Sequence, residues 1–342
     1  MSTPTLQTTN FPIFPVSRHI LTVQNRRWAV TSLQYAKLSD AHNDQHIQSA
    51  ITTMSKTLIT GASGFVGRNL VRFFLQHGSV IETDARTSSD FPTVMAMDVC
   101  NPEAVNDIFA RHAPGVVIHA AGIKDVRFCE KNPAEAHRIN GIGTGNIAAV
   151  CKKHGARLIY LSTDLVFDSY QGHYNETDTP RPSLAYGQAK YDGELLALEQ
   201  CPDAAICRSG GIYGSQSPLL KWLRDELQAG KKVQCYTDVY NSPTYVDNLA
   251  EMMLSIIRQN LSGVFHTVGS QRVNRYEFFD SFRKVFALPD GLLEPKPGGS
   301  QRDVMLLRPD SSLNFQKTAS LLKVNFDSPE TGFGRLKLSG VI

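Results

Sequence analysis

From residue 56 to about residue 212, short apolar runs alternate with longer segments whose apolar residues recur at helical spacing. The short runs have the length of buried strands. The predicted strands are residues 57–60, 80–84, 94–97, 116–120, 158–161 and 205–208, and the predicted helices are 66–76, 102–111, 133–154 and 186–199. Strands that alternate with helices form βαβ units. The pattern therefore predicts a parallel sheet covered by helices on both faces.

Beyond residue 212 the alternation weakens. Helical patterns at 219–228, 245–259 and 276–286 mix with short strands near Val233 and Val264, and the Pro/Gly-rich EPKPGG at 294–299 predicts a loop. We expect a smaller C-terminal α/β substrate-binding lobe, mainly residues 213–342, with segments near 240–268 returning to the sheet. Residues 54–212 then form the dinucleotide-binding part of an α/β, Rossmann-type doubly wound parallel fold.

Residues 1–53 differ in composition from the rest of the chain. They are rich in Ser, Thr, Gln and Asn, and their first acid is Asp40, although four basic residues precede it. Such a start is typical of an organelle transit peptide. We favour a start placed too far upstream or a disordered extension, because Met54 leads directly into the first predicted strand. The predicted fold therefore begins at Met54.

Composition narrows the class of protein. The 342 residues are 42% hydrophobic and 20% charged, as in globular proteins, and a net charge of +3 without a basic block argues against nucleic-acid binding. Six scattered cysteines form no metal-ligand or disulfide pattern and favour a reduced, cytoplasmic setting. No apolar run reaches the roughly 20 residues that span a bilayer. We expect no metal and no membrane contact.

A glycine-rich turn follows the first strand. The sequence TLITGASGFVG places Gly61, Gly64 and Gly67 between that strand and an amphipathic helix. Backbone N–H groups in such a turn approach a pyrophosphate closely, and the helix N-terminus attracts its charge. A glycine triplet alone is weak evidence, but this strand–turn–helix context predicts binding of NAD or NADP.

Residues after the second and third strands bear on the choice of cofactor. Asp84 lies where a carboxylate accepts hydrogen bonds from a ribose, which favours NAD. Arg86 lies where a guanidinium pairs with a 2′-phosphate, which favours NADP, unless it is a solvated loop charge. Asp98 and Val99 are placed to cap the adenine, although Asp98 is equally typical of a residue that starts a helix. The sequence leaves NAD or NADP open.

The segment STDLVFDSYQGHYNETDTPRPSLAYGQAK carries the candidate chemistry. Thr163 follows a predicted central strand, at the sheet edge where α/β folds bind ligands. Tyr186 and Lys190 share one helix face. A lysine ammonium stabilises a phenolate and lowers its pKa from about 10, while a threonine hydroxyl binds a substrate carbonyl. Separately these residues fit a turn and a surface helix, but beside a nicotinamide they form a catalytic set.

These motifs resemble the extended short-chain dehydrogenase/reductases, and within them most closely the dTDP-4-dehydrorhamnose reductases. The motifs that carry the resemblance are GASGFVG, HAAG, STDLVF, HYNETDTPRP, YGQAK, RSGGIYG, SPTYVDNLA and LRPDSSLNFQKTASLL. The resemblance implies that Thr163, Tyr186 and Lys190 are catalytic and that Tyr186 and Lys190 also bind the cofactor. It further implies cofactor contacts from Gly61, Gly64, Phe65, Val66, Gly67, Ala120, Ala121 and Gly122. Asn140 matches a proton-relay asparagine, or is a helix residue with a local hydrogen bond.

The resemblance implies NAD(P)H-dependent reduction of a 4-keto sugar nucleotide, with dTDP-4-dehydro-6-deoxy-L-mannose as the favoured substrate and with a homodimer left open. The segment IKDVRFCEKNP departs from the reductase pattern and puts the sugar in doubt. Leu165 replaces the glutamate of 4,6-dehydratases, which argues against dehydration. Two alternatives stay open: a sugar-nucleotide epimerase or dehydratase, and a non-catalytic subunit similar to the regulatory subunit of methionine adenosyltransferase.

Overall fold

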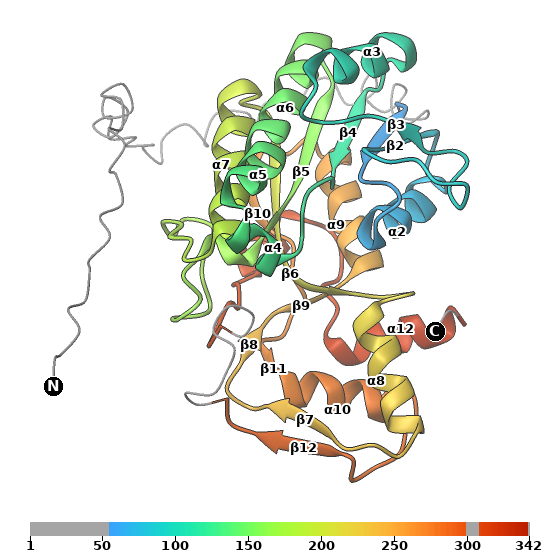
Figure 1. The fold of residues 1–342 in the computed structure, drawn as a ribbon, viewed down its shortest axis with the longest axis vertical. Helices are drawn as coiled ribbons and strands as arrows, with labels where there is room; N and C mark the ends of the chain where they lie inside the picture. The colour runs from blue at the N-terminus through green and yellow to red at the C-terminus, as the bar shows by residue number, and fades with distance from the viewer. Residues whose placement is uncertain (1–54, 299–307, 341–342) are drawn as a thin grey trace, which may run out of the picture. The chain divides into compact units, whose positions relative to one another are not determined.

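The computed structural model describes residues 55–298 and 308–340 (Figure 1). The predicted N-terminal extension lies outside the described residues. The central sheet is parallel, with the strand order β10-β6-β5-β4-β1-β2-β3 and with β9 paired to β6. Its strands are β1 (Thr57–Thr60), β2 (Val80–Asp84), β3 (Met95–Ala96), β4 (Val116–His119), β5 (Arg157–Thr163), β6 (Ala205–Tyr213), β9 (Pro243–Tyr245) and β10 (Gly263–His266). The predicted α/β doubly wound fold is confirmed.

Helices cover the sheet on both faces, because alternate strand residues point to opposite sides. On β1, Leu58 packs into one core and Ile59 into the other, and both are fully buried. The helices are α2 (Phe65–Phe74) and α9 (Val246–Arg258) on one face, and α3 (Pro102–His112), α6 (Gly143–His154) and α7 (Ala185–Gln200) on the other. Burying each such side chain contributes about 1.5–3 kcal/mol.

The helix predicted over 133–154 is interrupted by a π-helical segment. Helix α5 (Pro133–Ala136) leads into a π-helix (His137–Ile142), which continues into α6. Short π segments of this kind are frequent at functional sites. The π-helix carries Asn140 with its buried side chain facing the end of β4, where it hydrogen-bonds both the amide and the carbonyl of Ile123.

The C-terminal lobe lies below the sheet in Figure 1 and has its own aromatic core. It contains α8 (Pro218–Gln228), β7 (Val233–Tyr236), β8 (Tyr240–Asn241), β11 (Val273–Asn274), α10 (Arg275–Val285), β12 (Leu293–Lys296) and α12 (Pro329–Leu338), and α11 (Gln316–Leu321) precedes α12. The predicted loop at 294–299 is partly wrong, because its first residues form β12. Pro295 is tolerated there because, within the described part of the chain, β12 pairs with β7 alone and is an edge strand.

Candidate active site

The glycine turn is packed too tightly for side chains at two of its three glycines. Gly61 has φ +70°, and a Cβ there would lie 2.8 Å from Ala121 Cα. A Cβ on Gly67 would lie 2.0 Å from the Gly61 carbonyl oxygen. The turn thus holds the start of α2 against the end of β4, where Ala120 to Gly122 lie.

The N-terminus of α2 suits an anion. Gly64 is its N-cap and supplies no side-chain cap, and Phe65 and Val66 form its first turn. The first amides of a helix lack intrahelical acceptors and carry partial positive charge. A pyrophosphate at this turn would be bound by backbone N–H groups, so the cradle fits the predicted dinucleotide.

Asp84, at the end of β2, is tied to the glycine turn. Its Oδ2 accepts a hydrogen bond from the Ser63 hydroxyl at 2.6 Å and from the Ser63 amide at 3.2 Å. A carboxylate has about four acceptor positions, so this contact orients Asp84 and leaves acceptor capacity for a ribose. Arg86 follows two residues later and is exposed. The sequence alone did not indicate a role for Ser63, because a serine inside a glycine-rich turn carries no signal of its own.

Both residues predicted to contact the adenine, Asp98 and Val99, have other partners here. Asp98 accepts a hydrogen bond from the Cys100 amide at 2.9 Å, which fits a residue in the turn before α3. The Val99 side chain belongs to the core beneath α6, where a Cβ on Gly143 would lie 2.7 Å from its Cγ2. Their contact with adenine stays a prediction.

The end of β4 is held by Asn140. A Cβ on Gly122 would lie 2.6 Å from Asn140 Oδ1, so this side chain occupies the space above the glycine. The Asn140 carbonyl accepts a hydrogen bond from the Thr144 hydroxyl at 2.7 Å. Asn140 therefore positions the strand end that faces the glycine turn, whatever its part in a relay.

Thr163 and Tyr186 come together from β5 and α7. Thr163 is the last residue of β5 and is buried, and Tyr186 is the second residue of α7. Glu130, on α4 (Val126–Lys131), fixes the start of α7 by accepting a hydrogen bond from the Ala185 amide at 2.6 Å. Burial raises the pKa of Tyr186 well above its usual range, while a hydrogen bond with the Thr163 hydroxyl acts in the opposite direction.

Lys190 lies one turn further along α7 and is buried. Its ammonium donates a hydrogen bond to the Leu161 carbonyl at 2.6 Å and lies 4.1 Å from the centre of the Tyr160 ring. Burial lowers the pKa of Lys190 to about 7, and the Glu194 carboxylate opposes this effect. In this arrangement the ammonium is held by the strand rather than by the phenol, so its effect on Tyr186 stays a prediction.

A buried ion pair lies behind Lys190. Arg208, on β6, donates from Nε and Nη2 to the two carboxylate oxygens of Glu194, at 3.0 and 2.7 Å. Ser162 Oγ donates to the same carboxylate at 2.5 Å. This network joins β5, β6 and α7 directly beneath the candidate catalytic residues. The sequence offered one signal for it: Glu194 is four residues after Lys190 on the same helix face.

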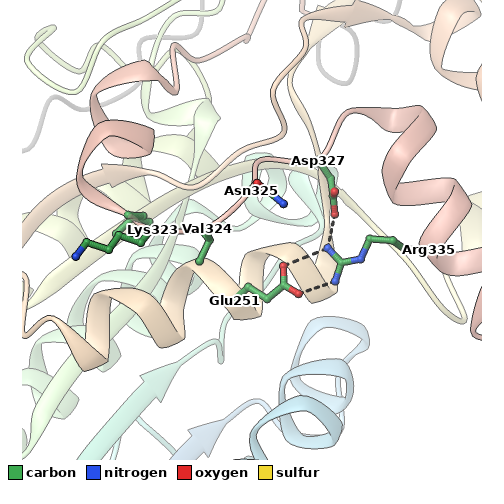
Figure 2. Close-up of a pocket in the computed structure, with 7 residues that line it drawn as sticks. Glu251, Lys323, Val324, Asn325, Asp327 and Arg335 are labelled. Atoms are coloured by element: carbon green, nitrogen blue, oxygen red, sulfur yellow. Dashed lines mark hydrogen bonds and ion pairs between the residues drawn. The ribbon is translucent and has the colours of Figure 1, made fainter. Parts of the chain in front are cut away.

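A hollow of about 650 Å³ lies between α9 and α12, away from these residues (Figure 2). Figure 2 shows Arg335 pointing at both Glu251 and Asp327, with hydrogen bonds of 2.6 and 2.5 Å. Arg335, Glu251 and Asp327 pair with one another, and Figure 2 shows the Lys323 side chain pointing away from them, so the hollow gives no argument for a ligand.

The described residues provide neither a metal centre nor a membrane-spanning helix. Within residues 55–298 and 308–340, no cluster of three or more His, Cys, Asp or Glu side chains could hold a metal ion. No helix in the described part of the chain is long and apolar enough to cross a membrane.

Comparisons with known proteins agree with this geometry. The profile of the RmlD substrate binding domain family matches residues 55–330. A dTDP-4-keto-6-deoxy-D-glucose reductase from Streptomyces niveus is 30% identical over 244 residues, which are 70% of this chain and 82% of the relative. Methionine adenosyltransferase 2 subunit beta from Xenopus laevis is 28% identical over 260 residues, which are 73% of this chain and 78% of the relative.

A solved structure shows the same fold. The dTDP-4-dehydrorhamnose reductase from Bacillus anthracis, in complex with NADP, aligns with a TM-score of 0.75 at 24% identity, over 84% of this chain and 100% of that one. The family resemblance inferred from the motifs is confirmed. Since the family profile spans residues 55–330, this chain belongs to the RmlD substrate binding domain family.

Proposed function

We propose that this protein uses a nicotinamide dinucleotide to reduce the keto group of a nucleotide-linked sugar. One observation carries the proposal: the Thr163 and Tyr186 hydroxyls meet at the carboxyl end of β5, in a sheet whose β1–α2 turn is shaped for a pyrophosphate. The reductase name of the Streptomyces niveus relative supports the choice of substrate class.

Each residue has a defined task in this proposal. The dinucleotide, when bound, supplies the hydride. Tyr186 donates the proton that the new alcohol requires, and Thr163 orients the carbonyl and stabilises the developing negative charge on its oxygen. Lys190, one helical turn from Tyr186, binds the nicotinamide ribose and lowers the pKa of the phenol that burial alone raises. dTDP-4-dehydro-6-deoxy-L-mannose is the favoured substrate.

The test is Tyr186→Phe, assayed as NADPH or NADH oxidation with a panel of 4-keto sugar nucleotides. Loss of the proton donor should lower kcat at least about a hundredfold, while dinucleotide affinity stays close to that of the wild type. Tyr191→Phe, on the same helix, is the matched control and should keep full activity. Unchanged turnover in Tyr186→Phe would refute the mechanism.

The choice between NAD and NADP rests on two adjacent side chains with opposite preferences. Asp84 accepts hydrogen bonds from a ribose, and the exposed Arg86 suits a 2′-phosphate. Titration of wild type and Arg86→Ala with NADH and NADPH tests these preferences. If Arg86 binds the 2′-phosphate, the variant loses affinity for NADPH and keeps its affinity for NADH.

A second candidate is a non-catalytic subunit, because the Xenopus laevis relative is named as subunit beta of methionine adenosyltransferase 2. In that case the dinucleotide would shape a surface for a partner protein. The two functions differ in a simple experiment. Absence of NAD(P)H consumption with every sugar nucleotide, together with co-purification of a stoichiometric partner, would favour the subunit.

Cytoplasmic localisation and a homodimer stay predictions. Cell fractionation tests the localisation, and light scattering tests the oligomeric state.

A further inference from the structure

The Thr163 hydroxyl faces the candidate active site and also hydrogen-bonds the buried carboxylate of Asp164. Its single proton is donated to Asp164 Oδ1 at 3.0 Å, and its oxygen accepts the Leu165 amide at 3.3 Å. A hydroxyl has one proton, so Thr163 cannot donate to Asp164 and to a substrate oxygen at the same time. With Asp164 ionised, Thr163 faces Tyr186 as an acceptor. That is the wrong direction for binding a substrate carbonyl.

Asp164 is enclosed by hydroxyl and backbone groups. It is buried, and Ser311 Oγ donates to its Oδ2 at 2.7 Å. A Cβ on Gly210 would lie 2.5 Å from the same oxygen, so β6 closes the space on that side. No ion pair to Asp164 occurs among the residues that the structure describes. Burial raises the pKa of this carboxyl to about 6, although its hydrogen bonds to Ser311 and Thr163 favour ionisation.

Other charged groups near Asp164 are either coupled to it or already paired. Asp164 precedes Leu165 and Val166 in a short 3₁₀ helix that packs against α7 and β6. On α7 the ionisable neighbour is Tyr186, whose pKa the Asp164 charge raises further. On β6 it is Arg208, which pairs with Glu194 at 2.7 Å. Next to Ser311, Asp310 pairs with Arg272 at 2.7 Å.

We propose that Asp164 is a positioning residue that sets the direction of the Thr163 hydroxyl, and that Ser311 controls the acid in turn. This inference rests on the proposed reductase function. When Asp164 is neutral, its own O–H donates to Thr163 Oγ1. The Thr163 proton is then free for the substrate oxygen, and Tyr186 keeps its proton for transfer. When Asp164 is ionised, Thr163 turns to the carboxylate and the carbonyl loses a donor.

The experiment is the pH dependence of kcat/KM in wild type, Asp164→Asn, Ser311→Ala and Ser312→Ala. Wild-type kcat/KM should fall as pH rises through the titration of Asp164, by at most roughly tenfold per pH unit. Asp164→Asn keeps a neutral donor and should abolish this fall. Ser311→Ala removes a hydrogen bond that favours the carboxylate, so the fall should move to higher pH by about one pH unit. Ser312→Ala, the matched control, should keep the wild-type profile.

A measurement without turnover separates this inference from the proposed function. The carbonyl stretch of a protonated carboxylic acid, followed by infrared difference spectroscopy, should disappear on titration in wild type, be absent in Asp164→Asn and persist to higher pH in Ser311→Ala. An inactive wild type with this infrared pattern refutes the reductase function. An infrared titration that is identical in Ser311→Ala and wild type refutes the control of Asp164 by Ser311. A folded Asp164→Asn that keeps the wild-type pH profile, or is inactive at every pH, refutes the positioning role.

Discussion

Arg208 and Arg335 each bind a glutamate through two guanidinium nitrogens, but their surroundings differ. The Arg208 and Glu194 side chains are 4% and 2% exposed, whereas those of Arg335 and Glu251 are 36% and 32% exposed. The first pair lies under the candidate site between β6 and α7. The second borders the hollow of Figure 2, between α9 and α12. The two arginine–glutamate pairs should therefore differ in their contribution to the free energy of unfolding and in their importance for the candidate site.

The buried pair organises the site because three elements converge on one carboxylate. Glu194 accepts hydrogen bonds from Arg208 and from Ser162, and its charge opposes the burial that lowers the pKa of Lys190. Arg208 also lies over the Phe167 ring at 5.2 Å. Removing the partner of a buried charge leaves that charge desolvated and destabilises the fold strongly. A surface ion pair contributes little, because each of its charges interacts almost as favourably with water.

Breaking the buried pair should give the largest effect. Arg208→Met leaves the Glu194 carboxylate buried without its cation, so the free energy of unfolding should fall by about 3–5 kcal/mol. Urea titration followed by circular dichroism measures it. The double variant Glu194→Leu/Arg208→Met removes both charges and should recover most of the loss. A double variant as unstable as the single one would show that packing, rather than the unpaired charge, causes the destabilisation.

Asp164 sharpens the comparison, because it is a buried carboxylate held by hydroxyls instead of a guanidinium. Its pKa is about 6 when folded and about 3.8 in the unfolded chain, so the neutral form stabilises the fold below about pH 4. This stability is lost as pH rises through 6, and the loss amounts to about 3 kcal/mol. The difference in unfolding free energy between wild type and Asp164→Asn, measured at pH 4 and at pH 7, should change by that amount. A pH-independent difference would contradict it.

The alternation of strands and helices was sufficient to predict the sheet, and the three glycines between the first strand and the first helix were sufficient to predict the turn, because both signals are local in the sequence. The sequence also predicted that Thr163, Tyr186 and Lys190 lie at one edge of the sheet, because Thr163 follows a strand and the other two residues are one helical turn apart. The loop predicted at 294–299 was partly wrong for a nonlocal reason. Leu293 to Lys296 form a strand only through pairing with β7, and nothing near them in sequence signals that partner.

The contacts that tune the site could not be predicted for the same reason. Ser311 lies 147 residues from Asp164 along the chain, and only folding brings its hydroxyl to that carboxylate. The hydrogen bond from Lys190 to Leu161 likewise depends on how α7 packs on β5. A motif identifies which residues carry the chemistry, but their hydrogen-bond partners and pKa values depend on tertiary burial.

Breaking the exposed pair should give the smallest effect. Arg335→Met keeps much of the apolar stem but removes the hydrogen bonds to Glu251 and Asp327 and the guanidinium carbon, which lies 5.1 Å from the centre of the Tyr245 ring. Solvent screens Arg335 and Glu251, which are 36% and 32% exposed, but Asp327 is only 9% exposed and loses its cation. The unfolding free energy should therefore fall by about 1–2 kcal/mol, less than for Arg208→Met, and by less in 1 M salt. Urea titrations of wild type and variant at low and high salt test both statements. A loss as large as that of Arg208→Met, insensitive to salt, would mean that the hollow between α9 and α12 shields its charges as fully as the sheet shields Glu194.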